Sequence, residues 1–141
     1  MTEVVAQERV RLALAEIARL ADEGSIEEYL RFFDAGAVWR MPVNPRTGAS
    51  AQVRTGRAEI GDAARARRAT GAVGPGTHTE HRIIDTSISF DSPDTARAVS
   101  RWEFVVETDV APRRTSEGRY VDVFRLVGGD WLLAERTISV G

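Results

Sequence analysis

Apolar side chains recur at three- and four-residue steps between residues 3 and 21, which is the spacing of one face of an amphipathic helix. The Asp-Glu-Gly sequence at 22–24 ends this predicted helix. Ser25 and Glu28 then have the spacing of a capping box. They predict a second, shorter helix directly after the first.

The pattern changes between residues 37 and 76. The sequence AVWRMPV at 37–43 has strand character and stops near Pro42, because proline cannot donate to a strand ladder. Residues 43–56 are polar and contain Gly and Pro, so they predict a loop. Residues 57–70 are rich in Ala and Arg and predict a third helix, which the sequence GAVGPG at 71–76 ends.

After residue 76 the apolar period becomes two, which indicates strands. Four long strands are predicted, at residues 78–91, 95–110, 118–127 and 131–140. Helices first and a run of strands afterwards predict an α+β fold, in which helices cover one face of a curved antiparallel sheet. We expect a single domain over residues 1–141.

Composition and charge exclude several classes of function without identifying one. The 141 residues carry a formal net charge of −2, and all 19 basic residues are arginines with no long run. This distribution argues against nucleic acid or an anionic membrane as a partner. Cysteine is absent, and no segment has the pattern of a leader or of a membrane span. The expected location is the cytoplasm.

Asp122 is the most informative polar position, because it lies in the predicted strand GRYVDVFRL at 118–126. Both faces of that strand are largely apolar, so the carboxylate must be protonated or must find a partner. An unpaired Asp122 would serve as an acid, whereas a pair with an arginine would be structural or substrate-orienting. Regular pairing across the Gly128-Gly129 turn places Glu135 on its face, and a one-residue bulge would place Arg136 there.

His81 is the second candidate for proton transfer. It shares the sequence HTEHRIID with His78, and the two are the only histidines. A spacing of three in a strand sends the two rings to opposite faces, and no carboxylate cluster completes a metal site. A histidine facing an apolar cavity is a natural general base or acid, and the alternative is a partly exposed residue at the start of a strand. Asp22 is interpreted as a helix-end residue.

Large side chains on the same strand faces predict a pocket. If the alternation holds, its lining contains Trp39, Met41, Ser100, Trp102 and Tyr120. Aromatic walls with few polar groups suit a planar apolar ligand, although aromatic residues in strands also form ordinary core. Neither a glycine-rich phosphate loop nor a serine nucleophile elbow is present, so no cofactor is implied.

Three sequences resemble the SnoaL-like branch of the nuclear transport factor 2-like superfamily. They are IARLADEGSIEEYLRFFDAGAVWRMPV, TGRAEI and GRYVDVFRLVGGDWLLAERTI. Together they extend over nearly the whole chain. The resemblance implies a cone-shaped sheet that encloses a pocket with three N-terminal helices, and it implies a homodimer. It also favours Arg136 as a residue of the pocket.

Individual branches of the superfamily carry different expectations. In the resemblance to ketosteroid isomerases, the general base falls on Met41 and the oxyanion-hole tyrosine on Ile17, so that mechanism is not retained. SnoaL-type polyketide cyclases have an Asp-x-Phe-Arg motif that matches 122–125, with its aspartate at Asp122. Scytalone dehydratase resembles the chain in its fold and in a histidine at the start of the strand that follows the third helix, which corresponds to His81. The sequence WRMPVNPR resembles the β subunits of ring-hydroxylating dioxygenases, which are structural partners of a Rieske-type subunit.

The leading hypothesis is a cofactor-independent cyclase, dehydratase or isomerase of a small hydrophobic metabolite. In it, His81 and Asp122 exchange protons with the substrate, Asp122 or Tyr120 stabilises an enolate oxygen, and Arg136 orients Asp122. The alternative is a non-catalytic module of the β-subunit type, or a ligand-binding protein without turnover.

Overall fold

The computed structural model describes residues 2–141 and contains three helices and one six-stranded sheet. The helices are α1 (Glu3–Glu23), α2 (Ile26–Leu30) and α3 (Gly56–Ala69). The strands are β1 (Phe33–Met41), β2 (Gln52–Thr55), β3 (Glu80–Ser92), β4 (Thr95–Val106), β5 (Arg113–Val127) and β6 (Asp130–Val140). This is the predicted α+β class, with the three helices in the N-terminal half.

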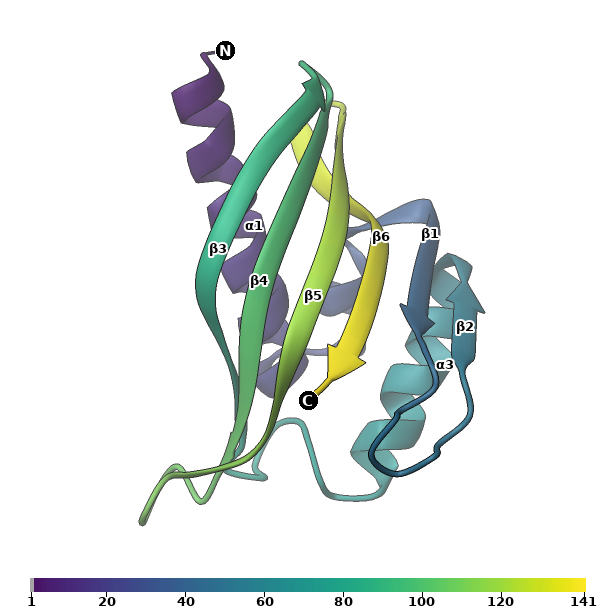
Figure 1. The fold of residues 1–141 in the computed structure, drawn as a ribbon, viewed down its shortest axis with the longest axis vertical. Helices are drawn as coiled ribbons and strands as arrows, with labels where there is room; N and C mark the ends of the chain where they lie inside the picture. The colour runs from purple at the N-terminus through teal and green to yellow at the C-terminus, as the bar shows by residue number, and fades with distance from the viewer. Residues whose placement is uncertain (1) are drawn as a thin grey trace.

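The strand order in the sheet is β2-β1-β6-β5-β4-β3. All neighbouring pairs are antiparallel except β1 and β6, which run parallel. Strands β3 to β6 are long and strongly curved, and α1 lies across one face of them (Figure 1). Helix α3 packs beside β1 and β2, so the helices and the curved sheet enclose the space between them.

Local sequence signals explain the helix boundaries. The side chain of Thr2 accepts a hydrogen bond from the Val5 amide and caps the start of α1. At the start of α2, Ser25 and Glu28 form both hydrogen bonds of the predicted capping box. Gly61 lies inside α3, where glycine is unusual. A Cβ at this position would be 2.9 Å from the side chain of Leu30 on α2. Glycine therefore allows α3 to approach α2 closely.

The core lies between α1 and the concave face of the sheet. Its fully buried large side chains include Val10 and Ile17 on α1, and Phe33, Phe124 and Leu133 on the strands. These positions follow the helical and strand periods of the sequence. Burial of such side chains stabilises the fold by about 1.5–3 kcal/mol each.

Several predicted boundaries were wrong. Strand β1 begins at Phe33 rather than at 37, because the short helix α2 already ends at Leu30. Residues 52–55 form the short edge strand β2 inside the predicted loop. The sequence did not predict this strand, because it is largely exposed and has no alternating apolar pattern. Strand β4 ends at Val106 rather than at 110, because the next residue, Glu107, leaves the extended conformation with a positive φ of 56°. Strand β5 begins five residues before Gly118, since its polar first residues pair with β4 through ion pairs such as Arg114–Glu103.

Candidate active site

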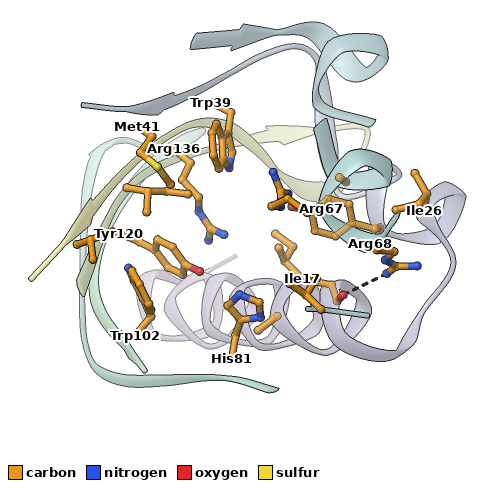
Figure 2. Close-up of a pocket in the computed structure, with 17 residues that line it drawn as sticks. Ile17, Ile26, Trp39, Met41, Arg67, Arg68, His81, Trp102, Tyr120 and Arg136 are labelled. Atoms are coloured by element: carbon orange, nitrogen blue, oxygen red, sulfur yellow. Dashed lines mark hydrogen bonds between the residues drawn. The ribbon is translucent and has the colours of Figure 1, made fainter. Parts of the chain in front are cut away.

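A cavity of about 160 Å³ lies between the concave face of the sheet and the helices (Figure 2). Apolar side chains dominate the lining, and the polar groups that enter it come from His81, Tyr120, Arg136, Arg67 and Arg68. The volume is close to that of an engineered cavity of about 150 Å³ that binds benzene. The cavity therefore fits a ligand of about one ring.

His81 and Asp22 form a hydrogen-bonded pair at the wall of this cavity. The Asp22 carboxylate accepts from the His81 backbone amide at 2.8 Å through Oδ2, and its Oδ1 lies 2.7 Å from the imidazole Nδ1. Asp22 is buried at the end of α1, whereas the His81 side chain is 23% exposed at the start of β3. A carboxylate oxygen beside Nδ1 favours the tautomer that carries its proton there, which leaves Nε2 as the acceptor nitrogen of the imidazole.

Neighbouring contacts fix the position of this pair. The ring of Phe104 lies 4.9 Å from the imidazole ring, centroid to centroid. Arg68 on α3 donates from Nη2 to the carbonyl oxygens of Leu20 and Ala21, at 3.0 and 3.1 Å. These bonds hold the last turn of α1, and therefore Asp22, against α3. The position of the Asp22–His81 pair thus depends on contacts from four elements, α1, α3, β3 and β4.

Asp122 and Arg136 form a second, fully buried pair. The guanidinium donates from Nε to Oδ1 at 2.8 Å and from Nη2 to Oδ2 at 2.9 Å, while the two side chains are 0% and 5% exposed. Burial raises the pKa of the Asp122 carboxyl, and the contact with Arg136 opposes this rise. Two parallel N–H donors on two carboxylate oxygens are the geometry of an ion pair.

A β-bulge decides which side chain meets Asp122. Val123 pairs with Glu135 and Phe124 with Leu133, so Ala134 is the extra residue on β6. Arg136 consequently lies opposite Asp122, which settles the alternative that the sequence left open. Glu135 faces the other side of the sheet, where its carboxylate accepts from Arg40 at 3.1 Å.

Tyr120 and Arg136 present polar groups from the sheet to the cavity. The guanidinium carbon of Arg136 lies 3.8 Å from the centroid of the Tyr120 ring, and the Trp102 ring stacks on Tyr120 with the two ring centroids 5.9 Å apart. Burial raises the pKa of Tyr120 to about 12. The phenol therefore remains protonated at neutral pH and can donate a hydrogen bond.

The structure places four of the five predicted lining residues in the cavity wall, namely Trp39, Met41, Trp102 and Tyr120. Ser100 is outside the lining, with 1% exposure and a buried hydroxyl that has no hydrogen-bond partner among the described residues. Asp122 is also outside it, behind Arg136. The side chain of Arg125, the last residue of the Asp-x-Phe-Arg motif, is exposed.

Sequence reasoning missed Asp22, Arg67 and Arg68 as site residues. A signal for Asp22 was present, because it follows Leu14 of the predicted apolar face by eight residues, a step that keeps a helical side chain close to the same face. The two arginines had no such signal. Their helix carries four arginines, and only the packing of α3 shows which of them face the cavity.

Among residues 2–141, no group of three or more His, Asp or Glu side chains could hold a metal ion. No helix in the same part of the chain is long and apolar enough to cross a membrane.

A cone of α+β structure around a small pocket is the cystatin-like arrangement of solved domains. A protein with a cystatin-like fold from Nostoc punctiforme is 19% identical, with a TM-score of 0.80 over 100% of this chain and 94% of that one. A candidate scytalone dehydratase from Novosphingobium aromaticivorans is 19% identical, with a TM-score of 0.71 over 98% of this chain and 85% of that one. The β subunit of a candidate aromatic-ring-hydroxylating dioxygenase from the same organism is 20% identical, with a TM-score of 0.74 over 96% and 89% of the two chains.

The model of the SnoaL-like domain matches residues 2–137, so the chain belongs to the SnoaL-like domain family. This confirms the resemblance seen in the sequence. No protein of curated function matches the chain.

Proposed function

We propose that the protein is a cofactor-independent enzyme that moves protons on a small ring-containing metabolite, as a dehydratase, isomerase or cyclase. The observation that carries this proposal is the His81–Asp22 pair at the wall of an apolar cavity. A buried carboxylate that orients an imidazole is a common arrangement for general acid–base catalysis. An apolar wall excludes water and strengthens the polar contacts inside.

In the proposed reaction, Nε2 of His81 removes a proton from the carbon next to a substrate carbonyl. The negative charge moves to the carbonyl oxygen, where Tyr120 and the free edge of Arg136 donate hydrogen bonds. The imidazolium then returns its proton. Transfer to a leaving hydroxyl releases water and completes a dehydration, whereas transfer to another carbon completes an isomerisation.

Asp122 is assigned a supporting role in this scheme. Both of its oxygens are occupied by Arg136, and it does not reach the cavity. Asp122 thus orients Arg136, which reverses the roles expected from the sequence. It is a positioning residue, and His81 is the proposed catalytic base.

A small β-hydroxylated cyclohexanone is a suitable probe, because its dehydration gives a conjugated enone with strong ultraviolet absorbance. Exchange of its carbon-bound hydrogens in deuterated water reports proton removal separately. We expect His81→Ala to lower both rates at least ~100-fold. His78→Ala is the matched control, since His78 is 58% exposed and lies outside the cavity lining. Equal rates for the two variants would refute the assignment.

A second candidate function is a non-catalytic module of the dioxygenase β-subunit type. The sequence WRMPVNPR and the structural similarity to one such subunit favour it. Co-expression with a Rieske-type subunit, followed by size-exclusion chromatography, separates the two: a stable hetero-complex supports the module, and a homodimer active on the probe supports the enzyme. We expect the homodimer, in the cytoplasm.

A further inference from the structure

Arg67 differs from the other charged side chains of the cavity because its guanidinium has neither a hydrogen-bond nor an ion-pair partner among the described residues. It lies in the last turn of α3, is half-buried, and lines the cavity. Its guanidinium carbon is 5.3 Å from the centroid of the Trp39 ring, which holds the group against an aromatic wall. No carboxylate among residues 2–141 lies within ion-pair distance of it.

The other charged groups of the cavity already have hydrogen-bond partners. Asp22 is bound to His81, and Asp122 is bound to Arg136 through both oxygens. Arg68 directs its guanidinium to the backbone carbonyl oxygens at the end of α1. Arg67 is therefore the charged group of the cavity whose guanidinium remains free to bind a ligand anion.

Arg136 adds donors on the same cavity. Its Nε and Nη2 bind Asp122, and Nη1 has no partner among the described residues. Figure 2 shows Arg67 and Arg136 entering the cavity on either side of Trp39. A planar guanidinium with free N–H groups matches the geometry of a carboxylate.

We propose that the substrate of this cavity is a single-ring carboxylic acid whose carboxylate is bound by Arg67. The inference rests on the proposed function, since it names the substrate class of the same site. The cavity of about 160 Å³ sets the one-ring size, and the unpaired guanidinium sets the charge. The ring lies against Trp39 and Trp102, and Arg67 fixes its orientation toward His81.

The test compares the binding of benzoate and of its neutral analogue benzamide by protein-observed NMR titration. We expect benzoate to bind the wild-type protein at least about tenfold more tightly than benzamide, because a charge-assisted hydrogen bond is about twice as strong as a neutral one. Arg67→Gln should bring the ratio of the two dissociation constants close to one. Arg65→Gln is the matched control on the same helix, since Arg65 pairs with Glu27 and Asp62 and is 52% exposed.

Three outcomes overturn the proposal: equal binding of the two probes to wild-type protein, a ratio that persists in Arg67→Gln, or no benzoate binding. Chemical denaturation of each variant checks that the fold is intact. His81→Ala should retain benzoate binding while losing turnover. A failure of the catalytic proposal is thus distinguishable from a failure of this one.

Discussion

Removal of the Asp122 carboxylate should lower the stability of the fold by several kcal/mol, because it breaks a buried ion pair. Asp122→Ala leaves the guanidinium of Arg136 without a counter-charge at a position where it is 5% exposed. Loss of one partner from a buried ion pair costs about 3–5 kcal/mol. The guanidinium lies 3.8 Å from the centroid of the Tyr120 ring in the wild-type protein too, so this cation–π contact is not gained in the variant and does not offset the loss. We therefore expect a loss of about 3–5 kcal/mol, out of about 5–15 kcal/mol for a typical domain.

Urea unfolding at neutral pH, followed by tryptophan fluorescence, measures this loss. Asp91→Ala is the control, because Asp91 pairs with Arg97 at 2.8 Å on the surface, where the two side chains are 48% and 53% exposed. That change should cost less than about 1 kcal/mol. The double variant Asp122→Ala/Arg136→Met should be more stable than the sum of the single effects predicts. An effect as small as that of the surface control, or strict additivity, would refute the buried ion pair.

Three further predictions concern the Asp22–His81 pair, the hydroxyl group of Tyr120, and the close packing of the sheet at Gly118. Asp22→Asn should lower the rate of proton removal by a factor of about 100 to 10,000 in the enone and exchange assays, because an amide no longer holds the proton on Nδ1 of His81; a rate near wild type would contradict it. Since the pKa of Tyr120 rises from about 10 in the unfolded chain to about 12 in the fold, stability should decline between pH 10 and pH 12. The decline should reach about 3 kcal/mol and be absent in Tyr120→Phe, as measured by denaturation across that range. Gly118→Ala should destabilise the protein strongly in thermal unfolding, because its Cβ would overlap the carbonyl oxygen of Ser139 and the Trp102 ring; unchanged stability would show that the strands can separate there.

Periodicity predicted the fold well because most elements are long and one-sided. Helix α1 and strands β4 to β6 each bury one face, and their apolar residues follow the corresponding period. The capping box at Ser25 and the glycine turn at 128–129 fixed two connections. Strand β2 was not predicted, because an exposed strand of four residues has no apolar period. The parallel pairing of β1 with β6 depends on contacts far apart in sequence.

The site was only partly predictable, because periodicity describes single elements and not the contacts between them. Alternation placed Trp39 and Tyr120 in the cavity wall, but alternation fails across a bulge, so it could not choose between Glu135 and Arg136. The partner of His81 was missed because Asp22 is 59 residues away and a helix-end acid usually has a local role. Pairing between distant charged groups is decided by packing, which a single sequence does not encode locally.

The bulge at Ala134 makes strand register a determinant of ligand charge that is separate from residue identity. If β6 paired with β5 without a bulge, Ala134 would lie opposite Val123 and Glu135 opposite Asp122, so Glu135 would turn inward in place of Arg136. The cavity wall would then change from cationic to anionic, with no substitution at any residue that contacts the ligand. The gain or loss of one bulge in β6 is thus a short evolutionary route between acidic and basic substrates on one unchanged scaffold.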